Sequence, residues 1–379
     1  MSGHSPRFCI VAGEASGDLY GAELARALRA LAPDAVVEGA GGPRMEAAGV
    51  TILFESERLG AMGFVEAHNK LAAFIQAYRH LTARLAATRY DAVVCIDCPE
   101  LNLRLARSAK KRGHRIIYYV TPQVWAWRTG RVRLLRRYVD RCLVVLPFEE
   151  AFYRAHHVAA EYVGHPLVDL ITPVPDRAGF VRDVGLDPVR PVVGLLPGSR
   201  RVEIRYMLPL LRGAAELLSQ ARSHLQFLVP VAPTVSRGQV EHYLDGHSLP
   251  LAVVDGRAHE VMDVADLCLI VSGTATLEAA ILGTPMVIIY QGSFLSWFVF
   301  MLLSRVTTYG LPNLVAGRPI VPELVQRAAS PEAVAREALA ILDEPAVRQT
   351  MVAELEKVRS LLGEKGAAER AARRILELL

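Results

Sequence analysis

Short runs of apolar residues alternate with longer amphipathic stretches along most of the chain. The first amphipathic stretch, Leu19–Leu31, predicts a helix, and similar stretches follow. In the first half the apolar runs predict strands at Phe8–Ala12, Ala35–Gly39, Asp91–Asp97, His114–Val120 and Arg141–Leu146. Continuous apolar strands separated by helices are typical of a parallel sheet that is covered on both faces.

A proline-rich segment, Thr172–Asp176, predicts a linker, and the same alternation restarts after it. The segment from Ser330 to Leu379 predicts helices only. The expected fold class is therefore α/β, with two Rossmann-like domains (1–171 and 172–345) whose parallel sheets face a cleft, and a helical tail (346–379) that packs back on an N-terminal domain. The second-half strands are expected at Pro191–Leu196, Leu225–Val229, Leu251–Val254, Leu267–Val271 and Pro285–Tyr290.

Composition narrows the class of protein. With 379 residues, 52% apolar and 22% charged, the chain is expected to fold as a globular protein. Its five cysteines are scattered singly, which suits a reducing compartment. The longest apolar run, Phe294–Leu303, is too short for a transmembrane helix, and the polar N-terminus predicts no signal peptide. A net charge of +4 is too weak to indicate a nucleic-acid partner.

The turn after the first strand is rich in small residues. Such residues let the backbone approach a ligand, and the following helix start offers N–H groups to anionic or hydroxyl groups. The pattern is neither a dinucleotide fingerprint nor a P-loop. A plain tight turn with Ser16 or Asp18 as the helix N-cap explains it equally well. The candidate residues on this side are Gly13, Glu14, Ser16, Gly17 and Asp18.

The second half opens with a comparable turn. Gly198 permits the turn after the strand, Ser199 follows, and Arg200 begins a helix where a guanidinium could hold a diphosphate. Glu203 would orient Arg200 or cap the helix. The alternative is a surface arginine beside an N-cap serine.

A second helix start in this half carries small hydroxylated residues. Unpaired N–H groups and the helix dipole make such a start an anion site. Glu278 could accept hydrogen bonds from ribose hydroxyls or complement the dipole. The candidates are Ser272, Gly273, Thr274, Ala275, Thr276 and Glu278.

Asp97 ends a predicted strand and precedes Cys98-Pro99. A carboxylate at the carboxyl end of a strand can act as a general base, whereas an N-cap role is the structural alternative. Cys95 and Cys98 also match C-x-x-C, but the apolar strand around Cys95 disfavours redox chemistry. No cysteine or histidine spacing indicates a metal site.

Around the expected helix Phe64–Leu81, apolar and basic residues interleave, a pattern that can lie in a lipid interface. Core packing of the same helix is the alternative. Two basic clusters, Arg104–Arg112 and Arg128–Arg137, could meet anionic head groups. The candidate membrane patch is Met62, Phe64, Val65, Leu71, Phe74 and Ile75.

A series of motifs in order resembles the lipid-A-disaccharide synthases, an inverting glycosyltransferase family of the GT-B type from Gram-negative bacteria. The resemblance extends from about Ile10 to Glu323. It rests on Val11–Asp18, Gly42–Met45, Met62–Glu66, Ile96–Asn102, Thr121–Arg128, Leu146–Glu149, Val163–Pro166, Leu196–Arg200, Ser272–Glu278 and Leu311–Leu314.

The resemblance implies transfer of 2,3-diacylglucosamine from a UDP donor to 2,3-diacylglucosamine 1-phosphate, which yields UDP and a β(1→6) disaccharide 1-phosphate. It implies no metal or cofactor, peripheral attachment to the cytoplasmic side of the inner membrane, and a homodimer with exchanged C-terminal segments as one available state. Asp97 would be the base for the acceptor 6-hydroxyl. Arg200, Ser272–Thr276 and Glu278 would bind UDP, and Asn313 would lie in the cleft near the diphosphate or acceptor. A UDP-sugar 2-epimerase of the same fold and a non-enzymatic nucleotide- or lipid-binding protein are the alternatives.

Overall fold

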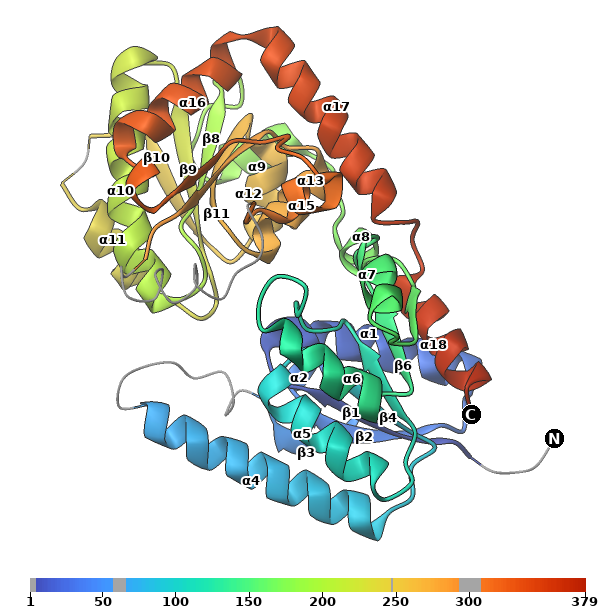
Figure 1. Cartoon of the computed structure of the whole chain (residues 1–379). Coiled ribbons are helices and arrows are strands. Elements are labelled where there is room, and N and C mark those ends of the chain that lie inside the picture. The colour runs from blue at the N-terminus through green and yellow to red at the C-terminus, as the bar shows by residue number, and fades with distance from the viewer. Residues whose placement is uncertain (1–4, 57–65, 247, 293–307) are drawn as a thin grey trace. The chain divides into compact units, whose positions relative to one another are not determined.

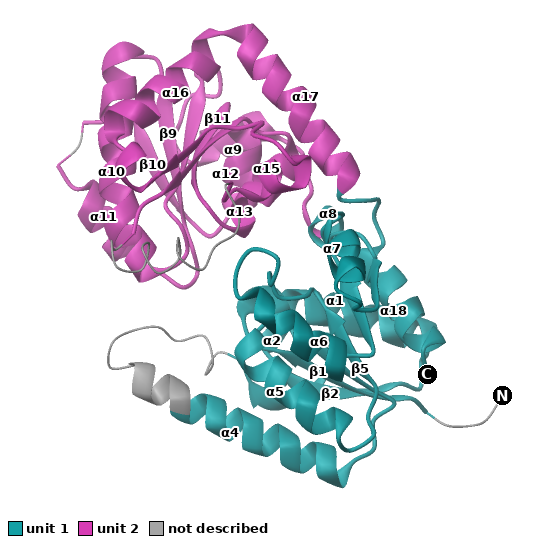
Figure 2. Cartoon of the chain, in the orientation of Figure 1, with its two compact units in different colours: residues 1–169, 362–379 teal, residues 170–361 magenta. Residues whose placement is uncertain are grey.

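Two units make up the chain, and each is built around a parallel sheet (Figure 2). The computed structural model describes residues 5–56, 66–246, 248–292 and 308–379. Unit 1 comprises Met1–Asp169 and Leu362–Leu379, and unit 2 comprises Leu170–Leu361. The two-domain, Rossmann-like α/β class expected from the sequence is confirmed.

The sheet of unit 1 has the strand order β3-β2-β1-β4-β5-β6-β7, with every described pair parallel. Helices cover both faces, so the central strands β4 and β5 are fully buried and β1 is buried from its second residue onward. The strands are β1 (Arg7–Ala12), β2 (Val36–Gly41), β3 (Thr51–Glu55), β4 (Ala92–Ile96), β5 (Ile116–Tyr119), β6 (Arg141–Val144) and β7 (Ala160–Tyr162).

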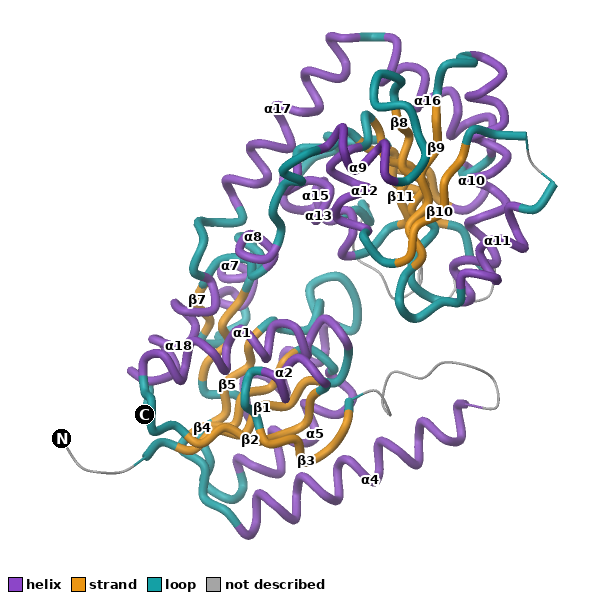
Figure 3. The backbone as a smooth tube through the Cα atoms, turned by 180° about the vertical axis from the view of Figure 1, so that it is seen from behind, coloured by secondary structure: helices purple, strands orange, loops and turns teal. Residues whose placement is uncertain are grey.

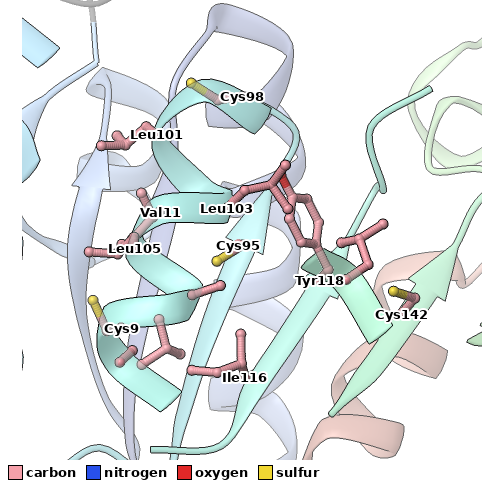
Figure 4. Packing of buried hydrophobic residues seen from close by; sticks show 14 of the residues in the cluster. Cys9, Val11, Cys95, Cys98, Leu101, Leu103, Leu105, Ile116, Tyr118 and Cys142 are labelled. Carbon is pink, nitrogen blue, oxygen red and sulfur yellow. The ribbon is translucent and has the colours of Figure 1, made fainter. Parts of the chain in front are cut away.

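Helices α4, α5 and α6 lie over one face of this sheet, and α1 and α18 pack together over the other (Figure 1). In the close-up of the first face, Cys9 and Cys95 of the sheet lie beside Leu105 of α5 (Figure 4). The helices of this unit are α1 (Ala15–Leu31), α2 (Pro43–Ala47), α4 (Glu66–Ala87), α5 (Pro99–Lys110), α6 (Val132–Tyr138), α7 (Glu149–Ala155), α8 (Leu167–Leu170, at the border) and α18 (Ala367–Glu377), with a 3₁₀ turn η1 (Thr129–Arg131).

The sheet of unit 2 has the order β10-β9-β8-β11-β12-β13 and is also parallel. Its strands are β8 (Val192–Leu196), β9 (Gln226–Val231), β10 (Leu251–Asp255), β11 (Leu267–Val271), β12 (Met286–Tyr290) and β13 (Glu323–Val325). As in unit 1, the strands lie between layers of helix (Figure 3). The helices are α9 (Arg177–Asp183), α10 (Arg201–Ala221), α11 (Arg237–Leu244), α12 (Ala258–Val264), α13 (Thr274–Leu282), α15 (Leu311–Ala316), α16 (Pro331–Asp343) and α17 (Pro345–Leu361), with a 3₁₀ turn η2 (Gln326–Ala328).

The C-terminal helices divide between the units, which differs from the expected boundary at residue 345. Helix α17 packs against α13, α15 and α16 and so belongs to unit 2. Helix α18 buries Ala371, Ala372 and Ile375 and packs against α1 of the same chain. The first border falls after Asp169 rather than after residue 171. An amphipathic pattern shows that a helix has a buried face but does not show which sheet it covers.

Candidate active site

Both sheets contain a switch point, where consecutive crossovers leave in opposite directions. In unit 1 it lies between β1 and β4, and in unit 2 between β8 and β11. Ligands of open parallel sheets bind beside the carboxyl ends of the strands at such points. The sequence-predicted turns fall there: Gly13–Asp18 and Asp97 in unit 1, and Gly198–Arg200 and Ser272–Thr276 in unit 2.

Asp97 follows β4 in a left-handed backbone conformation, with φ 44°, and Cys98 repeats it with φ 45°. Non-glycine residues adopt this conformation only where their surroundings hold it. Here the carbonyl oxygen of Asp97 accepts hydrogen bonds from the Tyr118 hydroxyl (2.6 Å) and from Nδ2 of Asn102 (2.8 Å). Its own N–H donates to the carbonyl oxygen of Val120 at 3.1 Å. The backbone of Asp97 is thus fixed from both neighbouring elements.

Burial raises the pKa of Asp97 to about 6, and the negative charges of Glu14 and then Glu100 add to the increase. A carboxyl group with such a pKa is suited to take up a proton near neutral pH. The cap position of α5 belongs to Cys98, so the N-cap interpretation of Asp97 is wrong.

The turn after β1 contains exposed residues as well as residues that are buried in the fold. Glu14 occupies the cap position of α1 and is exposed, and Ser16 is half-buried. Gly13 and Gly17 are buried, and a Cβ on Gly17 would lie 3.2 Å from that of Ala12.

Asp18 is not an open acceptor-side residue. It lies inside α1, 4% exposed, so it is also not the N-cap of that helix. Its Oδ1 accepts hydrogen bonds from the N–H groups of Gly42 (2.6 Å) and Met45 (3.1 Å), and Oδ2 accepts one from Arg44 (3.1 Å). Asp18 therefore caps α2. The sequence does not reveal these partners because they lie more than twenty residues away.

In unit 2, Glu203 organises the turn before α10. Its Oε2 accepts hydrogen bonds from the N–H groups of Ser199 (2.9 Å) and Arg200 (3.1 Å). Its Oε1 accepts from Nη1 of Arg200 at 2.9 Å, so Glu203 both caps the helix and orients the guanidinium. The side chain of Arg200 remains 55% exposed. Gly198 has φ 100° and a Cβ there would clash with Glu203. Arg200, not Ser199, holds the cap position.

The start of α13 has exposed residues at its first positions and a buried threonine further in. Gly273 and Thr274 are exposed and Ala275 is half-buried, whereas Thr276 is buried and donates from its hydroxyl to the carbonyl oxygen of Gly273 at 2.8 Å. Ser272 Oγ donates to the carbonyl oxygen of Tyr309 at 3.2 Å.

Glu278 lies in the second turn of α13, beyond the first turn where a carboxylate complements the helix dipole. Its Oε2 is 3.3 Å from Nε2 of His259. The carboxylate is therefore anchored beside α12, with its side chain 18% exposed.

Asn313 is not a cleft residue, because it is 1% exposed and its amide is fully used by the fold. Nδ2 donates to the carbonyl oxygen of Val321 (2.9 Å) and to Oε1 of Glu323 (2.6 Å). Oδ1 accepts from the N–H groups of Ile320 (2.7 Å) and Val321 (3.0 Å).

Glu323 in turn accepts from the N–H groups of Tyr309 (2.8 Å) and Gly310 (2.9 Å). Asn313 and Glu323 thus hold the loop whose Tyr309 carbonyl meets Ser272. Three residues that shape the site are not among the candidates from the sequence: Tyr118, Asn102 and Glu323. The available signal was a polar group within an otherwise apolar strand or helix face.

The C-x-x-C pair is unsuited to redox chemistry. Cys95 and Cys98 are both buried, and burial raises the pKa of the Cys98 thiol to about 12. The protonated thiol is a poor nucleophile.

The candidate membrane patch is described only in part. Met62, Phe64 and Val65 lie outside the described residues, as does the side chain of Leu71. Phe74 is half-buried against the core, and Ile75 is 43% exposed. Both line a cavity of about 620 Å³ between α4 and α5, together with Tyr78, Arg79, Arg104, Arg107, Ser108, Lys111 and Arg112. Within the described ranges, no helix has both the length and the apolar character needed to cross a bilayer.

Solved structures similar to this chain share its fold. UDP-GlcNAc 2-epimerase from Neisseria meningitidis bound to UDP-GlcNAc superimposes with a TM-score of 0.67 at 11% identity, over 99% of this chain and 100% of that one. The glycosyltransferase of kitacinnamycin gives a TM-score of 0.64 at 17% identity, over 99% and 100%. These likenesses include both enzyme classes and do not separate them.

The sequence relatives do separate them. Lipid-A-disaccharide synthase from Myxococcus xanthus (strain DK1622) is 44% identical over 375 residues, which cover 99% of this chain and 98% of that protein. The synthase from Geobacter sulfurreducens (strain ATCC 51573 / DSM 12127 / PCA) is 43% identical over 375 residues, with coverages of 99% and 98%. The family model of lipid-A-disaccharide synthetase matches residues 8–375. The epimerase alternative is not favoured, and the chain belongs to the lipid-A-disaccharide synthase family of GT-B glycosyltransferases.

Proposed function

We propose that this chain condenses UDP-2,3-diacylglucosamine with 2,3-diacylglucosamine 1-phosphate, and releases UDP and the β(1→6) disaccharide 1-phosphate. The observation that carries the proposal is the carboxyl group of Asp97, held at the switch point of one sheet with a pKa of about 6. The other sheet bears two helix starts and Arg200 at its own switch point. A base and an anion site are the two elements that this reaction requires.

In the proposed reaction, Asp97 accepts the proton of the acceptor 6-hydroxyl. The oxygen attacks the anomeric carbon of the donor from the face opposite to UDP, so the configuration inverts. The bond between that carbon and the UDP oxygen breaks, and its electron pair leaves with the diphosphate. Arg200 and the N–H groups at the start of α13 stabilise the developing negative charge. The proposal includes no metal or cofactor.

Both substrates carry acyl chains, so we place the enzyme on the cytoplasmic face of the inner membrane of a Gram-negative bacterium. The exposed Ile75 and the basic residues around the α4–α5 cavity support this attachment. A homodimer that exchanges C-terminal segments would use the α1–α18 contact, here made within one chain, between two chains. The proposal includes no nucleic-acid partner.

The test supplies the purified protein with both acylated sugars and follows products by mass spectrometry. Formation of disaccharide and UDP in equal amounts is expected. The Asp97→Asn variant should lose about 10²–10⁴ in rate and still bind UDP, since the amide keeps the size of the side chain but cannot take the proton. An epimerised UDP-sugar without disaccharide, or unchanged substrates, would reject the proposed reaction. Turnover of Asp97→Asn within a few-fold of the unmodified protein would move the base to another carboxylate.

A further inference from the structure

A cluster of two arginines, one tryptophan and one carboxylate lies at the carboxyl edge of the first sheet. Oε1 of Glu100 accepts hydrogen bonds from Nη2 of Arg131 (2.8 Å) and Nη1 of Arg128 (3.5 Å). The guanidinium carbons of Arg128 and Arg131 lie 4.6 and 5.9 Å from the centroid of the Trp127 ring. We propose that this cluster binds the phosphate monoester of the acceptor sugar, an assignment that rests on the proposed function.

The guanidiniums of Arg128 and Arg131 point to the same place, which indicates where an anion is stabilised. They meet on a single carboxylate oxygen, so that position already stabilises negative charge from two directions. A phosphate monoester offers several such oxygens, and the planar fork of arginine matches their geometry. The cluster stays accessible, because Arg128 is 45% exposed and Glu100 is 47% exposed. With Glu100 ionised, the two guanidiniums leave the cluster itself with one net positive charge.

The loop that carries Trp127 and Arg128 is fixed by hydrogen bonds on its buried side. Arg128 has a left-handed backbone with φ 53°, which requires support from its surroundings. Nε1 of Trp125 donates to Oε1 of the buried Glu149 at 3.0 Å. Oε2 of Glu149 accepts from the N–H groups of Val145 (3.2 Å) and Leu146 (3.0 Å), after β6. The buried carboxylate thus ties the loop to the end of the neighbouring strand, and the arginines are positioned before a ligand arrives.

The cluster and the proposed base share one edge of the sheet. Glu100 lies in the first turn of α5, three residues after Asp97. Its charge also contributes to the raised pKa of Asp97, after burial and Glu14. A sugar whose phosphate is held by Arg128 and Arg131 therefore has its ring beside the carboxyl group that removes the hydroxyl proton.

The test compares two acceptors, 2,3-diacylglucosamine 1-phosphate and the same sugar without phosphate, by kcat/KM. The unmodified enzyme should prefer the phosphorylated acceptor. Arg131→Gln and Arg128→Gln should each lower this preference about 10- to 100-fold, the worth of a charge-assisted hydrogen bond. Arg131→Lys should restore only part of it, because a point charge lacks the fork. The KM for the UDP donor should not change. Arg136→Gln, at an exposed arginine of α6, is the matched control and should keep the preference.

Three outcomes overturn the site. If a variant lowers kcat/KM equally for both acceptors, the arginines only support the loop. If the preference for the phosphorylated acceptor is unchanged, the arginines and Glu100 form only a surface ion pair. Loss of binding to phosphatidylglycerol vesicles with the preference intact would assign the cluster to lipid head groups.

If the unmodified protein forms no disaccharide, the proposed function fails, and the site is judged separately. Calorimetry with 2,3-diacylglucosamine 1-phosphate then compares the unmodified protein with Arg131→Gln. Weaker binding by the variant supports the site, and equal binding rejects it.

Discussion

The hydroxyl of Tyr118 donates a 2.6 Å hydrogen bond to the carbonyl oxygen of Asp97. Tyr118 lies on β5 and is fully buried, and burial raises the pKa of its hydroxyl well above the usual value. The group therefore remains a donor at any physiological pH. Together with Asn102, it holds the left-handed turn from which the carboxyl group of Asp97 projects.

Tyr118→Phe tests this positioning. Loss of the hydroxyl should lower the free energy of unfolding by about 0.5–1.5 kcal/mol and lower kcat about tenfold, with little change in KM. Urea unfolding and steady-state kinetics measure the two effects. Tyr153→Phe is the matched control, because that buried hydroxyl also donates to a backbone carbonyl, of Pro122 at 3.2 Å. It should lose similar stability and keep the kcat of the unmodified protein. An unchanged kcat in Tyr118→Phe would contradict the positioning role.

The charge of Glu14 should be visible in the pH profile. As the proposed base, Asp97 must be ionised to accept a proton, and its pKa is raised to about 6, so kcat/KM should rise with pH through that region. Glu14 is the largest contributor to the increase after burial. Glu14→Gln removes a negative charge, which makes ionisation of Asp97 easier and should shift the acid limb to lower pH.

Glu23→Gln changes a carboxylate on the same helix that pairs with Arg26, and it should leave the acid limb in place. If Glu14→Gln also leaves the limb in place, the group that titrates there is not Asp97.

Continuous apolar runs predicted ten strands to within two residues at either end. The apolar pattern does not predict β3, β7 and β13, which are half-buried strands at sheet edges. An edge strand has one hydrogen-bonded neighbour and less helix cover, so its apolar run is free to be short, as in β3, β7 and β13. The edge strand β10 keeps a run of apolar residues, Leu251–Val254, and is predicted.

The candidate site also contains some features that the sequence predicts and some that it does not. Turns at the strand ends could be predicted, because the carboxyl ends of parallel strands share one edge. Asp18 and Asn313 were misassigned because a polar residue near a predicted turn looks the same whether it meets a ligand or a distant backbone group. Only the folded chain shows that their hydrogen-bonding groups are already used.

Arg200 should control affinity for UDP. Its guanidinium is more than half exposed and is held by Glu203, so Arg200→Ala should weaken UDP binding by about 1.5–3 kcal/mol. Arg200→Lys should recover only part of the loss. Calorimetry with UDP measures both, with Arg201→Ala at the neighbouring exposed arginine as the control. UDP binding that is unchanged in Arg200→Ala would remove this residue from the site.

Asn313 should behave as a structural residue. Asn313→Ala leaves several buried backbone groups without partners and should lower the free energy of unfolding by about 2–4 kcal/mol. The reason is that its amide meets Ile320, Val321 and Glu323. Urea unfolding measures the change. UDP affinity, measured under conditions where the variant is folded, should fall much less than in Arg200→Ala. Normal stability with lost UDP affinity would return Asn313 to the binding site.

Membrane attachment can be tested at Ile75 without disturbing the core. The side chain is 43% exposed at the α4–α5 cavity, so it can contribute apolar area to a lipid interface and little to folding. Ile75→Ser should weaken binding to anionic vesicles by about 1 kcal/mol, roughly fivefold, and leave the urea midpoint nearly unchanged.

Phe74→Ser should instead destabilise the fold, because that ring packs against the core of unit 1. Val347→Ser provides the matched control, since Val347 is 37% exposed on α17 of the other unit. It should change neither vesicle binding nor stability. Because basic residues surround the cavity, high salt should weaken the binding of the unmodified protein as well. If Ile75→Ser cosediments with vesicles as well as the unmodified protein does, and salt has no effect, this face of α4 and α5 is not the attachment surface.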